Sequence, residues 1–117
     1  AAVLRFDGDR LAVVDCSLAL SRREEYEVVG TDGRLTVPVA FLPGTADAEI
    51  RIMKGTNRST ETIPGVNQYQ LMVEHFADVV TGRAPLALPP EDAVANLRVI
   101  EAALRSVKSS HVEAVEP

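Results

Sequence analysis

The hydrophobic period of this sequence changes near its middle, and that change limits the possible folds more than any other feature. Residues 1–63 contain short runs in which apolar and polar residues alternate, separated by turn residues such as Asp7-Gly8. A period of two is typical of β-strands. Residues 67–108 instead repeat apolar side chains every three or four positions, which is the period of an α-helix. The order predicts an α+β fold, with strands first and helices second.

Six strands are expected in the first half, each joined to the next by a short turn. They cover residues 3–6, 10–20, 26–30, 34–41, 49–54 and 59–63. Short connections favour an antiparallel meander, so we expect a mostly antiparallel open sheet. Pro38 cannot donate a hydrogen bond to a ladder, which places its strand at an edge or at a bulge. A last short strand is expected at His111–Val115.

Two helices are expected in the second half, packed on one face of the sheet. The first covers residues 67–81, because Asn67 and Gln70 form a capping-box pattern and Gly82 is a common helix stop. The second begins at Pro90, and its first turn carries two acidic residues that suit the positive end of the helix dipole. One stripe of the second helix is expected to be buried: Ala93, Leu97, Ile100, Leu104 and Val107. Residues 1–117 are interpreted as a single domain.

Composition excludes several classes of function. A net charge of −5 argues against a nucleic-acid partner and against docking to an anionic membrane. No apolar run reaches the roughly 20 residues that span a bilayer. Cys16 is the single cysteine, which suits a reducing compartment, so we expect a cytoplasmic protein. Its alternating apolar surroundings predict that Cys16 is buried.

Complete catalytic and cofactor motifs are absent from the sequence. Neither GxGxxG nor GxxxxGK[ST] occurs, so no nucleotide site is expected in this chain. His75, His111 and Cys16 are too widely spaced for a recognisable metal site. Tyr69, in the first turn of the first helix, has two interpretations. It is either a packed tyrosine with a satisfied hydroxyl or a residue that contacts a ligand at the rim of the sheet.

The long strand predicted at residues 10–20 has two different faces. Its even positions are apolar and are expected to lie under the second helix. Its odd positions form a mixed face: Leu11, Val13, Asp15, Ser17 and Ala19. Two helices can cover only one face of a sheet, and an apolar patch left in water favours association. We therefore expect a dimer or higher oligomer that forms through this open face.

Three segments resemble a known family of enzymes. The hairpin Tyr26–Val37 contains Gly-Thr-Asp-Gly, the first predicted helix ends in Thr81-Gly82-Arg83-Ala84-Pro85, and Pro90–Ser106 resembles a closing helix. In this order they resemble the C-terminal domain of the glucose–fructose oxidoreductase / inositol dehydrogenase / MocA family. Together they cover nearly the whole chain.

The resemblance implies the C-terminal half of a two-domain oxidoreductase that acts on a sugar, a polyol or a related hydroxy compound. NAD or NADP would be bound by an N-terminal Rossmann domain, which is absent from this sequence. This half would supply a wall of the substrate pocket and an oligomer interface, and would be inactive alone. Tyr69 falls near a position at which family members touch substrate. The alternative is a free-standing α+β module for binding or dimerisation, without enzymatic activity.

Overall fold

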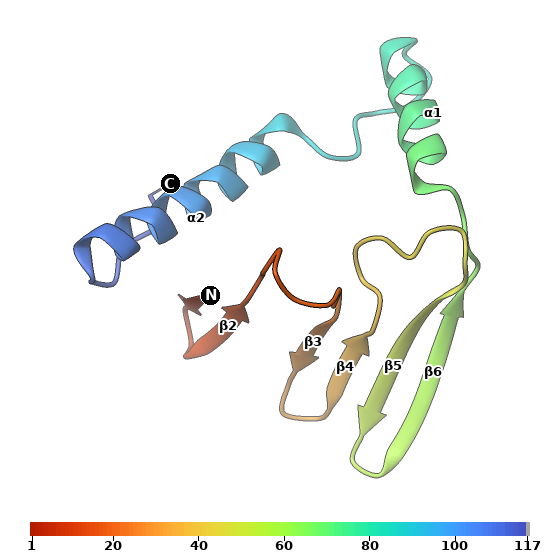
Figure 1. The fold of residues 1–117 in the computed structure, drawn as a ribbon. Coiled ribbons are helices and arrows are strands. Elements are labelled where there is room, and N and C mark those ends of the chain that lie inside the picture. Colours follow the sequence, from red (N-terminus) through yellow and green to blue (C-terminus); the bar gives the residue numbers. More distant parts are fainter. Residues whose placement is uncertain (117) are drawn as a thin grey trace. The chain divides into compact units, whose positions relative to one another are not determined.

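The computed structural model describes residues 1–116 and has an α+β architecture. It contains two antiparallel sheets and two helices, which confirms the predicted fold class (Figure 1). The described residues form two compact units. One unit combines Ala1–Ala19 with the residues from 85 onward, and the other is Leu20–Ala84.

The first unit begins with a two-stranded hairpin. Strand β1 (Ala2–Phe6) pairs antiparallel with β2 (Arg10–Val14). Gly8 and Asp9 turn the chain with φ angles of 69° and 57°. Glycine adopts this left-handed region without strain, and aspartate tolerates it better than most residues. The hairpin predicted from Asp7-Gly8 is therefore confirmed.

Strand β2 is shorter than the sequence indicated, and the prediction for residues 15–20 was wrong. The ladder ends where Val14 faces Ala2. Beyond it, the Ser17 hydroxyl accepts a hydrogen bond from the backbone N–H of Ala19 at 3.1 Å. A local serine turn of this kind competes with strand pairing. Cys16 lies in this irregular segment and is exposed rather than buried.

Helix α2 (Pro90–Ser109) completes the first unit. Proline in the first turn and the two acidic residues after it appear as predicted. The half-buried or buried side of the helix is formed by Val99, Ala102 and Ala103, with Ala102 only 4% exposed. These three residues and Leu4 of β1 line a cavity of about 320 Å³.

The buried stripe predicted for α2 was wrong. All of its members are exposed. Leu97, Ile100 and Leu104 each expose more than half of their surface. The segment after α2 was also predicted wrongly, because residues 111–116 form no strand. Arg105 holds this segment by donating to the Ala114 carbonyl at 2.9 Å. The Ser106 hydroxyl donates to the His111 carbonyl at 2.6 Å.

The second unit contains the predicted meander. Its strands are β3 (Tyr26–Val29), β4 (Arg34–Val37), β5 (Ala48–Lys54) and β6 (Asn57–Ile63), hydrogen-bonded in that order. The structure therefore has a four-stranded and a two-stranded sheet in place of one sheet, since residues 15–25 do not extend either ladder.

Two residues shape the inner strand β4. A Cβ atom on Gly33 would clash with the carbonyl oxygen of Met53, so only glycine lets β4 begin this close to β5. The strand ends at Val37, directly before Pro38. Of the two alternatives predicted for Pro38, the edge strand was wrong, because β4 lies between β3 and β5, and the bulge was not found either, because Pro38 lies beyond the end of β4. Proline instead ends the strand, since it has no N–H to donate.

The two faces of the four-stranded sheet differ in chemistry. Residues opposite each other in the ladder point to the same face, and neighbours along a strand point to opposite faces. The apolar face carries Tyr26, Val28, Leu35, Val37, Ile50 and Ile52. Val37 is the most buried residue of this sheet, at 9% exposed. The other face carries arginine, glutamate and threonine side chains.

Helix α1 (Gln68–Val80) follows the sheet. The Asn67 side chain accepts a hydrogen bond from the backbone N–H of Gln70 at 3.2 Å, so the predicted N-cap is confirmed. Gln70 does not return the bond, because its amide donates to Glu74 at 2.7 Å. Gly82 follows the C-terminus with a φ angle of 71°, as a helix stop requires.

Candidate functional site

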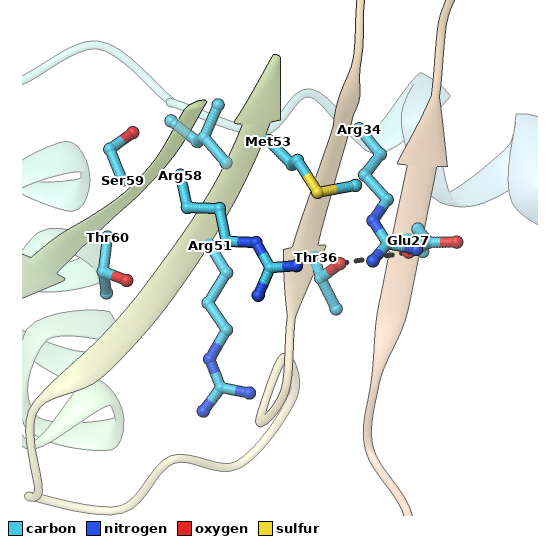
Figure 2. A pocket seen from close by; sticks show the side chains of 9 residues that line it. Glu27, Arg34, Thr36, Arg51, Met53, Arg58, Ser59 and Thr60 are labelled. Carbon is cyan, nitrogen blue, oxygen red and sulfur yellow. Dashed lines mark hydrogen bonds and ion pairs between the residues drawn. The ribbon is translucent and has the colours of Figure 1, made fainter. Parts of the chain in front are cut away.

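The polar face of the four-stranded sheet holds a shallow depression of about 360 Å³ (Figure 2). The side chains that define it come from all four strands. They are Glu27, Arg34, Thr36, Arg51, Arg58 and Thr60. All of them lie in the second unit, and hence in one compact part of the chain.

Strand register brings these side chains together. Glu27, Thr36, Arg51 and Thr60 form one row across β3, β4, β5 and β6, because each is the ladder partner of the next. The neighbouring row contains Arg34 and Arg58, which flank Met53. Cβ atoms of directly opposed residues are about 5 Å apart, so the long side chains of both rows can reach the same ligand.

Ion pairs neutralise two of the three arginines in part. Glu27 accepts a hydrogen bond from the Thr36 hydroxyl at 3.1 Å and lies 3.6 Å from the Arg34 guanidinium. Arg51 is paired with Glu49 of its own strand, at 3.0 Å. Arg58 has no carboxylate partner among residues 1–116. Counting Glu27 and the Glu49 that pairs with Arg51, the three arginines face two glutamates, a formal charge of +1 (3 − 2), on a chain of charge −5.

This arginine cluster (Arg34, Arg51 and Arg58) was not predicted from the sequence. Each arginine occupies an alternating position of its strand. Arg34 and Arg58 each precede a threonine by two residues. Such patterns are common on solvated strands. The convergence depends on the ladder register, which pairs Arg51 with Thr60 and aligns Arg34 with Met53.

Within residues 1–116, no three His, Cys, Asp or Glu side chains lie close enough together to hold a metal ion. Neither of the two helices in this range is long and apolar enough to cross a membrane.

A comparison with protein families identifies the architecture. The model of the oxidoreductase family, C-terminal alpha/beta domain, matches residues 1–116. The chain belongs to this family. The match covers both compact units, from the β1–β2 hairpin through α2, and it confirms the resemblance drawn from the hairpin and helix motifs.

A curated relative supports the same assignment. The chain is 28% identical over 121 residues to an uncharacterised oxidoreductase, ORF334, of Rhizobium meliloti. The alignment covers 97% of this chain and 36% of that protein, so the chain spans about a third of the relative's length. No solved structure matches the chain.

Tyr69 lies in the first turn of α1 and is 60% exposed. Most of its side-chain surface is therefore exposed in this structure. It does not line the depression on the polar sheet face. The second unit thus carries an exposed tyrosine on α1 and, on other residues, a cationic depression on the sheet.

The predicted interface residues do not share one strand. Leu11 and Val13 lie on β2 and are 65% and 73% exposed, on the face opposite to the half-buried Ala12. The three other members of the set follow the end of β2 and are exposed in the irregular segment: Asp15, Ser17 and Ala19. Only the first two residues therefore remain on a sheet face.

Proposed function

We propose that this chain is the C-terminal domain of an NAD(P)-dependent oxidoreductase that acts on a sugar, a polyol or a related hydroxy compound. The observation that carries the proposal is the family match over residues 1–116, since it spans both compact units. The name of the Rhizobium meliloti relative describes an oxidoreductase too. The parent protein's substrate and its nicotinamide cofactor are part of the proposal.

The cofactor, NAD or NADP, is assigned to an N-terminal Rossmann domain of the parent protein. The sequence of this chain has neither GxGxxG nor another glycine-rich phosphate turn that opens a helix. The hydride acceptor would consequently bind elsewhere, and this domain would shape the pocket in which the substrate hydroxyl is oxidised. Residues of this chain would orient the substrate without transferring the hydride.

Tyr69 is the residue that we assign to the substrate pocket. Its phenol is exposed, and a tyrosine hydroxyl can both donate and accept a hydrogen bond. Those are the interactions that a polyhydroxylated substrate offers. Its place in the first turn of α1, beside the loop that leaves β6, keeps the side chain on a helix with a satisfied N-cap.

A second copy of the chain is the partner that we assign to the exposed face of the β1–β2 hairpin. Val3 and Val13 are directly opposed in the ladder, and Leu11 lies on the same face. All three are at least 65% exposed. An apolar strand face of this kind is stabilised when a symmetric copy covers it.

The test uses the parent protein with NAD⁺ and NADP⁺ and a panel of sugars and polyols. Reduced cofactor, measured by its absorbance, should accumulate with at least one substrate. Tyr69→Phe should lower kcat/KM by about tenfold, as expected when one hydrogen bond to substrate is lost, and should leave the melting temperature unchanged. Tyr26→Phe is the matched control, because it removes the same hydroxyl group from a tyrosine of β3 in the same unit.

One result would contradict the proposed function, and another would contradict only the role of Tyr69. If the parent protein neither binds nor reduces either cofactor, the chain is a binding or dimerisation module. If both tyrosine variants are kinetically identical to wild type, the enzyme assignment stands and Tyr69 has no role in the substrate pocket.

A further inference from the structure

We propose that the depression on the polar face of the four-stranded sheet binds an oxyanion, the phosphate or carboxylate group of a small molecule. This site is separate from the pocket assigned to Tyr69 and from the hairpin face assigned to a second copy. Three observations carry the inference: the three arginines that line one depression, their incomplete neutralisation, and the hydroxyl groups among them.

The register of the strands places the three arginines on one face of the sheet. The arginine cluster takes one guanidinium from each of three adjacent strands, β4, β5 and β6. Arg58 extends across β5 toward Thr36, with Arg51 on the same side of the sheet (Figure 2). Guanidiniums bind phosphate and carboxylate oxygens through two parallel N–H bonds, and this geometry makes arginine the preferred residue for such groups.

The charge balance favours an anion. Like charges placed close together on a sheet face repel, which is a cost to the folded protein. Arg34 and Arg51 each have one glutamate, whereas Arg58 has no carboxylate partner among the described residues. An oxyanion bound between Arg51 and Arg58 would supply the missing negative charge. It would also be attracted to a local positive field on a chain that is acidic elsewhere.

Hydroxyl groups complete the recognition chemistry. Thr60 is the ladder partner of Arg51, and within residues 1–116 its hydroxyl forms no hydrogen bond. It can therefore donate to an oxyanion held by the two neighbouring arginines. Thr36 differs, because its hydroxyl already donates to Glu27. Glu27 lies at the β3 side of the depression and would repel an anion there, and Glu49 is already paired with Arg51 on β5. The proposed position is therefore between β5 and β6, beside Arg58 and Thr60 and on the side of Arg51 away from Glu49.

The size of the depression limits the ligand. About 360 Å³ lies at the lower end of the range that small-molecule sites occupy. It admits a phosphate or carboxylate group with a short organic body. Phosphate is tetrahedral and carboxylate is planar, but both present negatively charged oxygens that a guanidinium can bind. The experiment therefore uses a probe of each kind.

The probes are inorganic phosphate and malonate, titrated at constant ionic strength against the full chain labelled with ¹⁵N. Saturable shifts of the amides of Arg51, Arg58 and Thr60 are expected with at least one probe, while sodium chloride should produce none. Saturation by phosphate alone identifies a phosphate ligand, and saturation by malonate alone identifies a carboxylate ligand. Absence of saturation with both probes would overturn the proposal.

Substitutions separate a site from general charge attraction. Arg58→Gln should weaken the affinity by about tenfold, because it removes one charge-assisted pair, and Arg58→Lys should restore part of the loss. Arg98→Gln is the control, since it removes the same charge from an exposed position of α2. Equal weakening by Arg58→Gln and Arg98→Gln would overturn the site.

The oligomeric state provides an independent outcome. Light scattering of wild type and Arg58→Gln should give the same mass, because the proposed ligand is a small molecule. A lower mass for Arg58→Gln, without any anion binding by wild type, would overturn the proposal and assign the arginine cluster to a contact between proteins. All variants are first compared with wild type by circular dichroism, and Arg58→Lys preserves the test if Arg58→Gln does not fold.

Discussion

Glu24 connects the segment before β3 to the segment after β4. Its carboxylate accepts a hydrogen bond from the Arg22 guanidinium at 2.6 Å and another from the backbone N–H of Leu42 at 3.2 Å. Its carbonyl accepts from the N–H of Ala40 at 2.6 Å. The Arg22 hydrogen bond lowers the pKa of Glu24 most, the Leu42 bond lowers it further, and partial burial opposes both.

The lowered pKa predicts how stability depends on pH. A carboxyl whose pKa is lower in the folded protein stabilises it at pH values above the unfolded pKa, about 4.3 for glutamate, and this contribution is lost as the pH falls through the folded pKa. Glu24→Gln should therefore have a lower melting temperature than wild type at pH 7, and the difference should shrink below about pH 4.

Thermal melts from pH 7 to pH 3 measure this effect. Glu25→Gln is the control, because Glu25 is exposed and has no ion pair among the described residues. A Glu24→Gln deficit that stays constant over the whole range would contradict the role of the ionised carboxylate.

At the scale of single elements, the two glycines of the β3–β4 turn have different roles. A Cβ on Gly33 would clash with the Met53 carbonyl of β5, whereas a Cβ on Gly30 would meet its nearest neighbour at an ordinary 3.9 Å. Gly33→Ala should therefore destabilise the protein by about 1–3 kcal/mol through forced separation of β4 and β5, and Gly30→Ala by much less. Urea unfolding of both variants compares them, and equal losses would refute the close approach.

Helix α1 depends on its cap. Asn67 satisfies the N–H of Gln70, one of the four N–H groups that a helix leaves unpaired at its start. Asn67→Ala should cost about 1 kcal/mol, and Asn67→Asp should cost little because it keeps the acceptor. Chemical denaturation should show this order, and a loss of equal size in both variants would show that the amide nitrogen matters instead.

At the scale of the whole molecule, the predicted self-association now depends on the β1–β2 hairpin. Of the five predicted interface residues, only Leu11 and Val13 lie on a strand. Val13→Glu should weaken self-association at micromolar concentration by about tenfold or more, because an unpaired carboxylate is costly to bury in an interface. Ala95→Glu, on the exposed side of α2, adds the same charge and should have no effect. Light scattering measures both, and a wild-type protein that is monomeric at these concentrations would exclude the dimer.

Local chemistry was sufficient for several of the elements. The turn at Asp7-Gly8, the cap at Asn67 and the proline start of α2 depend on neighbours within about four residues. The strands of the meander likewise follow from alternation and turn residues, and the ordered motifs identified the family.

Tertiary structure decided the rest, because packing and register involve residues distant in sequence. Periodicity marked an apolar stripe on α2, but the side that is buried contains Ala102, which no hydrophobic pattern distinguishes. Alternation continued to residue 20, but the ladder stopped at Val14, where its partner strand ends. The arginine cluster exists because β5 registers with β4 and β6, and register is a property of the paired strands rather than of any one of them.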